Sequence, residues 1–358
     1  MKLQPSQIHQ ALKPLSSDTR GFMRSSKSLI KNLLRLLPGN ISKQLLISRS
    51  FRLNYKYDQD RFLKWSSSWQ QNLSAVQLKA LITMDYHRIE KGLSLKEPKV
   101  GFGSDVVERL VKNLKTFQQA YGYDEVISFS LNALSEYHQF NKINGLYNQK
   151  LHEEILALGG DNEYEESCAG TLKVSKKEIL KACLIDLENF FQARYSIRQF
   201  SDEDVNISLV EKAVKMAQKT PSVCNRQSSK VYIFSDSEDK KRSLSYQNGN
   251  RGFGHQASKV LVVTSNLEHF TKIGERNQCW IDGGMFAMSL VYALHSLGLG
   301  TCCLNWSVEY HTDKAFRQSV DIQDSEAVIM LIAVGHLPEE FKVAQSPRKQ
   351  IQEVLVIK

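Results

Sequence analysis

The stretch Arg194-Tyr195-Ser196-Ile197-Arg198, with Pro221-Ser222-Val223-Cys224-Asn225-Arg226-Gln227 about two dozen residues later, carries the strongest signal in this sequence. The first stretch holds two guanidinium groups and a hydroxyl, and the second holds two carboxamides beside a helix-breaking proline. Because Arg194 and Arg198 are four positions apart, we expect them to share one side of a helix start and to converge on an anionic group. Together the two stretches predict a site for an anionic, planar ligand that forms many hydrogen bonds.

Each stretch also has a purely structural interpretation. The two arginines could form ordinary surface salt bridges to Asp202 or Glu203. The amides of Asn225 and Gln227 could satisfy only their own loop. In favour of a site, Thr220-Pro221-Ser222 is expected to end a helix with a sharp turn, and such turns expose polar groups at clefts.

Helices and strands are expected to alternate around these stretches. Ser208 and Glu211 form a capping-box pattern at the start of a helix that ends before Pro221. A long helix is expected over Ile281–Leu297, stopped by Gly298-Leu299-Gly300. Strands are expected in four apolar runs, Lys230–Phe234, Lys259–Thr264, Thr301–Leu304 and Val328–Val334. This order predicts a mixed α+β layer.

The length of 358 residues favours more than one folding unit. Apolar residues recur at three- and four-residue spacing in Leu73–Ile89 and in Val106–Phe117, which predicts helices. Residues 159–166 are first glycine-rich and then acidic, which is typical of a linker. We therefore expect a basic amphipathic segment over 1–55, a helical region over 56–158, a linker over 159–174 and a mixed domain over 175–358.

The N-terminal segment is strongly basic, with ten lysines or arginines and one acid, Asp18, among residues 1–55. Within it, Ser28–Leu37 predicts an amphipathic helix stopped by Pro38-Gly39. Such a helix could dock its leucines on the rest of the protein, or residues 20–55 could make peripheral contact with an anionic membrane. No nucleic-acid-binding module accompanies the charge, so a nucleic acid partner is not expected.

The six cysteines show neither a C-x-x-C pair nor histidines at metal-ligand spacing, so neither a metal site nor a disulfide framework is expected. This pattern fits a reducing, cytoplasmic location, at most peripheral to the inner face of the membrane. Residues 1–20 lack an apolar signal-peptide core, and no run of about 18 apolar residues indicates a membrane span.

Four motifs, in order, resemble those of the FMN-dependent nitroreductase family, the fourth being a closing motif made of a strand, an arginine and a C-terminal arm. Arg194–Phe200 resembles the family's opening R-x-S-x-R-x-F, and Pro221–Gln227 resembles its P-S-x-x-N-x-Q. The later motifs are the central helix with its G-L-G end, the closing strand with its G-x-P turn, the phosphate-binding arginine and the extended arm, in Trp280–Thr301, Ala333–Pro338, Arg348 and Ile351–Ile357. The resemblance covers about residues 180–358 and leaves the N-terminal helical extension unassigned.

The resemblance implies a mainly antiparallel sheet flanked by helices, in a homodimer with FMN at the subunit interface. Carried over position by position, Arg194, Ser196, Arg198 and Arg348 would hold the phosphate and ribityl chain, and Asn225 would meet the flavin ring. A backbone N–H near Leu304 or Asn305 would face flavin N5. The full set of implied cofactor-binding residues is Arg194, Ser196, Arg198, Pro221, Ser222, Asn225, Gln227, Leu304, Asn305 and Arg348.

The implied activity is reduction of an electron-poor small molecule by NADH or NADPH through bound FMN, with no dedicated catalytic side chain. Ser228-Ser229 and Asn305-Trp306 depart from the family pattern and leave the substrate open. One alternative is a flavin-dependent dehydrogenase or oxidase of a biosynthetic pathway. Another is a degenerate flavin-fold protein that docks on a membrane or a partner.

Two further clusters have both structural and functional interpretations. Asp85–Gly92 could be a solvated helix end capped by Gly92, or His87, Arg88 and Lys91 could reach over the pocket to select an anionic substrate. Cys302-Cys303 could be small strand residues beside the flavin or redox-active thiols.

Overall fold

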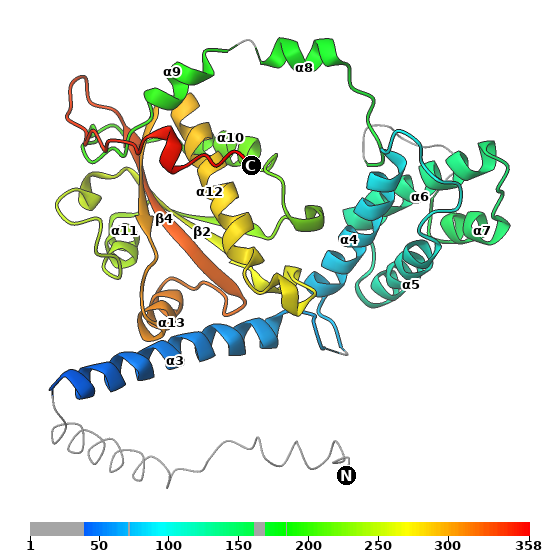
Figure 1. Ribbon diagram of the computed structural model, residues 1–358, viewed down its shortest axis with the longest axis horizontal. Helices are drawn as coiled ribbons and strands as arrows, with labels where there is room; N and C mark the ends of the chain where they lie inside the picture. Colours follow the sequence, from blue (N-terminus) through cyan, green and yellow to red (C-terminus); the bar gives the residue numbers. More distant parts are fainter. Residues whose placement is uncertain (1–38, 71, 161–168, 184) are drawn as a thin grey trace, which may run out of the picture. The chain divides into compact units, whose positions relative to one another are not determined.

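The computed structural model describes residues 39–70, 72–160, 169–183 and 185–358 (Figure 1). The chain divides into two compact units, Met1–Asp58 and Gln59–Lys358. The second unit contains a sheet with flanking helices and a separate group of helices that precedes it in the sequence.

A four-stranded antiparallel sheet lies at the centre of the second unit. Its strands are β1 (Ser229–Phe234), β2 (Lys259–Asn266), β3 (Leu299–Asn305) and β4 (Glu326–His336), in the order β1-β2-β4-β3. Each expected strand is present and is longer than expected at one or both ends. The mixed α+β prediction, with a mainly antiparallel sheet, is confirmed.

Helices cover both faces of the sheet, so its central strands are apolar on both sides. On β2, Val260 and Val262 pack with Phe316 on one face. Leu261 and Val263 pack on the other face against α10 (Ile207–Ala217) and α12 (Gln278–Ser296). The first face is covered by α11 (Ser237–Leu244) and α13 (Tyr310–Ser319).

The long helix α12 lies close to the sheet because Gly283 has no side chain. A Cβ at this position would come within 2.7 Å of Cδ1 of Ile329 on β4. At the other end of α12, Gly298 takes a left-handed conformation with φ of 79° and turns the chain directly into β3. The predicted helix is therefore confirmed, but it begins three residues earlier, at Gln278.

The start of α10 differs from the prediction. Asn206 caps this helix, and its side chain accepts a hydrogen bond from the backbone N–H of Ser208. The expected Ser208 cap is wrong because helical geometry already begins at Ile207. Two short helices that the sequence did not indicate, α8 (Lys176–Ala182) and α9 (Leu187–Gln192), precede the Arg194 stretch.

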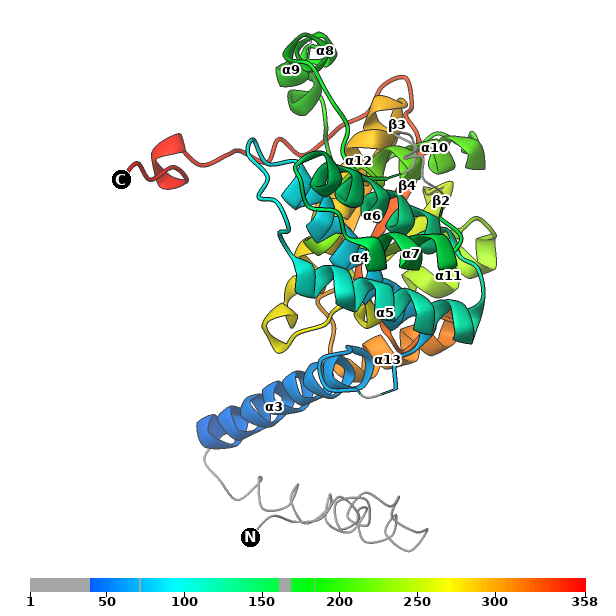
Figure 2. The ribbon, with the colours of Figure 1, turned by 90° about the vertical axis from the view of Figure 1, so that its right-hand side faces the viewer.

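Four helices that precede the sheet in the sequence pack together around a hydrophobic core of their own (Figure 2). They are α4 (Ala75–Leu93), α5 (Ser104–Tyr121), α6 (Glu125–Ile143) and α7 (Gln149–Ala157), so both expected helices are present. The carboxylate of Asp85 is fully buried among them and accepts two hydrogen bonds of 2.8 Å from Arg109. Gly92 lies inside α4 against the ring of Phe102 rather than capping it, because the helix continues to Leu93.

Helix α3 (Gly39–Trp65) spans the division between the units. The amphipathic helix predicted over Ser28–Leu37 lies outside the described residues. Among the described helices, none is both long enough and apolar enough to cross a membrane.

Candidate functional site

The Arg194 stretch forms an extended segment at the edge of the sheet. Ser196 pairs in parallel with Thr301 of β3, and the backbone N–H of Ile197 donates to the carbonyl of Thr301 at 2.8 Å. The expected helix start is wrong because α9 has already ended at Gln192 and the buried Ile197 anchors the chain in the core. An extended chain still places residues i and i+4 on one side, so Arg194 and Arg198 keep a common face.

Neither arginine forms a surface salt bridge with a described residue. Among the described residues, no carboxylate lies within 4.0 Å of either guanidinium group. Glu203, one of the expected partners, lies 3.8 Å from His336 instead. Arg198 lies over the ring of Phe253 at 5.9 Å and donates a long hydrogen bond of 3.4 Å to the carbonyl of Ser196. Two cations are therefore available for an anionic ligand.

The third expected arginine, Arg348, lies in the C-terminal arm after β4. Its side chain is exposed and donates to the carbonyl of Ser346 at 2.7 Å. This bond leaves the other guanidinium donors available to an anion.

Strand β3 gives this edge an exposed polar surface. Cys303 and Asn305 are exposed, whereas Leu304 is buried in the core, so Leu304 can offer a ligand only its backbone. Cys302 is buried, and burial raises the pKa of its thiol despite the opposing charge of Arg198. A protonated, buried thiol is unreactive, which favours the structural interpretation of Cys302.

Gln247 supports the end of β3, and sequence reasoning missed it. Its amide nitrogen donates to the backbone carbonyl of Asn305 at 3.0 Å, and the residue is only 6% exposed. Gln247 lies in a stretch rich in polar and glycine residues, where no spacing links it to Asn305.

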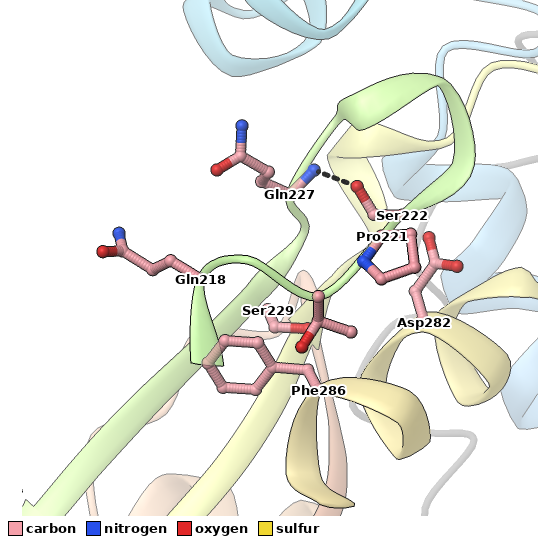
Figure 3. Close-up of a pocket in the computed structure, with 8 residues that line it drawn as sticks. Gln218, Pro221, Ser222, Gln227, Ser229, Asp282 and Phe286 are labelled. Atoms are coloured by element: carbon pink, nitrogen blue, oxygen red, sulfur yellow. Dashed lines mark hydrogen bonds between the residues drawn. The ribbon is translucent and has the colours of Figure 1, made fainter. Parts of the chain in front are cut away.

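The Pro221 loop has an unusual backbone. Cys224, Asn225 and Gln227 have φ values of 50°, 53° and 49°, in the left-handed region that non-glycine residues seldom occupy. Two hydrogen bonds fix this shape. Gln227 N–H donates to Ser222 Oγ at 3.0 Å (Figure 3), and Val223 N–H donates to the Asp282 carboxylate at 3.1 Å. Such strain persists only where surrounding contacts enforce it, and it is frequent at functional sites.

A buried ion pair fastens the middle of this loop, and it too was not foreseen. Arg226 is 3% exposed, and its guanidinium donates to both carboxylate oxygens of Glu275 at 2.8 and 3.1 Å. Burial raises the pKa of Glu275, but the hydrogen bonds and charge of Arg226, together with the backbone N–H groups of Thr271 and Lys272, outweigh burial and hold that pKa below its usual value. The imidazole of His269 also contacts the carbonyl of Arg226 at 2.7 Å. The interior of the protein therefore determines the loop's conformation.

A small cavity lies behind the loop (Figure 3). Its volume is about 90 Å³, and its lining includes Pro221, Ser222, Gln227, Asp282 and Phe286. This volume is enough for water but far below the 300 Å³ or more of a typical cofactor site. The cavity therefore accompanies the loop and does not itself hold a large ligand.

The two predicted halves of the site lie far apart in one chain. Asp282, near the start of α12, holds the Pro221 loop, whereas His295, near its end, contacts the carbonyl of Phe190 in α9 at 3.2 Å. The intervening helix is about 20 Å long. The sheet register leads to the same conclusion. Ser229, which follows the Pro221 loop, is level with Ala327 near the start of β4, whereas Thr301, which pairs with Ser196, is level with Val334 near its end. The two halves therefore lie at opposite ends of the sheet.

The expected selector residues in α4 are occupied within the helical region. His87 contacts Glu90 at 3.0 Å, and Arg88 donates to the buried Asp85 at 3.2 Å, while Lys91 is exposed. Helix α4 does contact the Pro221 loop at its 3-10 turn η1 (Val223–Asn225). No cavity described above is lined by these three residues.

Comparison with known proteins finds similarity between the C-terminal half and one family. Residues 191–247 and 237–336 match the model of the nitroreductase family. An FMN reductase (NADPH) of Bacillus subtilis is 26% identical over 156 residues, which is 39% of this chain and 61% of that protein. The match thus spans less than two thirds of the relative's length. The resemblance of the C-terminal half to the nitroreductase family is confirmed.

Solved structures with related chains cover the same half. An FMN-dependent nitroreductase of Clostridium difficile is 24% identical with a TM-score of 0.37, over 43% of this chain and 90% of that chain. A nitroreductase-like chain from Desulfovibrio desulfuricans, solved in complex with FMN, is 18% identical with a TM-score of 0.42, over 49% of this chain and 97% of that one.

Proposed function

We propose that this chain, whose residues 191–336 match the nitroreductase family, is an FMN-dependent oxidoreductase that takes electrons from NADH or NADPH and delivers them to an electron-poor small molecule. The observation that carries the proposal is the pair Arg194 and Arg198, which have no carboxylate partner among the described residues and lie in the segment that pairs with β3. The relative named FMN reductase (NADPH) supports FMN and a nicotinamide reductant.

The donor set fits the phosphate end of FMN. Arg194 and Arg198 would bind the phosphate dianion with charge-assisted hydrogen bonds, and Arg348 of the C-terminal arm would add a third cation. Ser196, held between the arginines by its pairing with Thr301, would bind the phosphate or the ribityl chain. Within the part of the chain that the structure describes, no carboxylate pairs with these three cations, which is the physical reason to expect an anionic ligand.

The flavin ring would lie against residues with free polar groups. Asn305 would present its backbone N–H group to the reactive edge of the ring, and Gln247 would hold the segment Leu304-Asn305 in place through the carbonyl of Asn305. Bound FMN would supply the two-electron redox chemistry itself. The protein's part would be to orient the ring and exclude water.

We propose further that a second copy of the chain completes the site. Pro221, Ser222, Asn225 and Gln227 lie at the opposite end of α12 from Arg194, too far to serve the same FMN within one chain. A homodimer would bring one copy's loop to the other copy's arginines. The exposed apolar residues along α12, Trp280, Ile281, Met285 and Met288, support burial against a second copy.

The test is the visible absorption spectrum of the purified full-length protein, followed by anaerobic mixing with each nicotinamide. We expect a yellow protein with flavin bands whose colour is bleached by NADH or NADPH. Colourless protein that does not take up added FMN would refute the proposal. Bound FMN that neither nicotinamide bleaches would favour the dehydrogenase or oxidase alternative.

We also propose that the basic N-terminal segment, residues 20–55, contacts anionic membrane surfaces. The described part of α3 supports this, since it exposes Leu45, Phe51 and Leu53 beside Arg49 and Arg52. Sedimentation with vesicles containing anionic lipid is expected to carry down the full chain but not a variant with Arg49 and Arg52 changed to Gln. Equal sedimentation of both would remove this proposal.

A further inference from the structure

We propose that a cleft in the helical region is a binding site for a small organic anion bearing a carboxylate or a phosphate group. The cleft lies between α6, α7 and the turn that joins them, and its volume is about 340 Å³. This volume falls at the lower end of the range for small-molecule sites. Its polar lining consists of Ser135, His138, Gln139, Lys142, Tyr147 and His152.

Three basic side chains meet in this cleft. The imidazoles of His138 and His152 are stacked, with ring centroids 5.2 Å apart and planes inclined by 14°. Lys142 follows His138 by one helical turn, and its ammonium group lies 5.8 Å from the centre of the Tyr147 ring. Basic groups that converge in this way disfavour one another's protonation unless an anion lies between them.

Among the described residues, the nearby carboxylates have other partners. Glu136 accepts a hydrogen bond from the backbone N–H of Thr171, and Glu154 pairs with Lys115. No aspartate or glutamate is among the described residues that line the cleft. An incoming anion would therefore meet basic groups that no described lining carboxylate neutralises.

His138 contributes a buried polar atom without a partner to this cleft. It is 9% exposed, and its Nδ1 has no hydrogen-bond partner within the described residues. Burial lowers the pKa of His138, and the charges of His152 from α7 and Lys142 from α6 lower it further. Tyr147, from the turn, is the remaining titratable group facing this ring. An anion would favour the protonated imidazole.

A metal ion suits this geometry poorly. Two imidazoles, and no cysteine or acidic side chain, are among the residues that line the cleft, whereas protein metal sites usually supply three or more such ligands. The described residues also contain no group of three or more histidine, cysteine or acidic side chains arranged to hold a metal. The half-exposed ring of Tyr147 and the side chain of Ile155 would instead accommodate the apolar body of an organic ligand.

The experiment is calorimetric titration of the full-length protein at constant ionic strength with sulfate, benzoate, phenyl phosphate and the neutral benzyl alcohol. We expect the anions to bind and benzyl alcohol not to bind. Sulfate stays a dianion between about pH 6 and about pH 8, so tighter binding at the lower pH would report protonation of the histidines. Tighter binding of phenyl phosphate than of benzoate would assign the ligand as a phosphate ester, and the reverse would assign it as a carboxylate.

Two variants and one control locate the site. Lys142→Gln and His152→Gln each remove one basic group, and each is expected to weaken sulfate binding about tenfold. Lys150→Gln removes the same charge from α7 outside the cleft lining and is expected to leave binding unchanged. Absence of sulfate binding, or equal effects of Lys150→Gln and Lys142→Gln, would overturn the proposal. Neither result depends on FMN.

Discussion

Arg194 and Arg198 are candidate ligand-binding residues because neither pairs with a carboxylate of the described residues. A surface arginine ordinarily finds a carboxylate, yet Asp202 and Glu203 follow in the sequence without pairing with either. The backbone is extended at Ser196, which pairs with Thr301 of β3, and the guanidinium group of Arg198 lies over the ring of Phe253. Such residues are available for binding at no cost in broken salt bridges.

Substituting Arg198 by alanine is therefore expected to weaken FMN binding by about 10- to 100-fold, since a hydrogen bond to a charged group contributes about 1.5–3 kcal/mol. Arg198→Lys should recover only part of this loss because an ammonium group cannot form the paired contacts of a guanidinium group. Fluorescence titration of apoprotein with FMN measures both. Arg242→Ala, which removes an exposed arginine of α11, is the control. An unchanged dissociation constant in Arg198→Ala would contradict the phosphate assignment.

Asp324 gives a prediction about acid stability. Burial opposes ionisation, but hydrogen bonds from Arg317, Lys64 and Trp65 lower the pKa of Asp324 from 3.8 to about 2. Because the folded pKa is depressed, its stabilising contribution is complete above the unfolded pKa and is lost as the pH falls from about 4 toward 2.

The unfolding free energy of wild type should therefore exceed that of Asp324→Asn near neutral pH, and this difference should shrink through the acid range. Urea unfolding at a series of pH values measures it. Asp202→Asn, which removes an exposed carboxylate from a loop before α10, is the control. A difference that stays constant with pH for Asp324→Asn would show that ionisation of Asp324 does not contribute to the free energy of unfolding.

The Pro221 loop is an element whose shape depends on one buried pair. Replacing Arg226 by glutamine leaves Glu275 buried without its partner, and breaking such a pair costs about 3–5 kcal/mol. Adding Glu275→Gln removes the uncompensated charge, so the double variant should be more stable than Arg226→Gln alone. Urea unfolding measures both, and additive losses would contradict the pairing.

Hydrogen exchange tests the loop's strain separately. Arg226→Gln should speed exchange of the amides in residues 222–228 because it frees a left-handed backbone. Cys224→Gly in that background should slow exchange again, since glycine adopts a φ of 50° without strain. Cys224→Ala is the matched control and should not do so. Identical exchange in all variants would mean that Arg226 does not hold the loop.

Elements with strong periodicity were predictable from the sequence, and those set by tertiary pairing were not. The apolar run at Lys259–Thr264 indicates a buried strand whatever surrounds it, and β2 is that strand. The Arg194 stretch has no such pattern, and its conformation depends on pairing with Thr301, a hundred positions away. The ion pair between Arg226 and Glu275 could likewise not be predicted from the sequence, because only the folded chain brings the two residues together.

At the scale of the whole molecule, the sequence motifs indicate the parts of a flavin site but not their distances. Arg194 and Asn225 are close in the sequence, yet α12 lies between the places where they are held. The site proposed here is complete only when two copies contribute, so purified protein should have the mass of a dimer in light scattering. A monomer that binds FMN with full affinity would contradict this.

Complementation between two defective variants tests the shared site most directly. Arg198→Ala damages the phosphate half and Asn225→Ala the loop half, so each alone should bind FMN weakly. After subunit exchange in an equal mixture, random pairing puts half of the chains in mixed dimers, each with one intact site, so about a quarter of all sites should bind FMN tightly. A mixture that binds no more FMN than its separate components would contradict a site built from two copies.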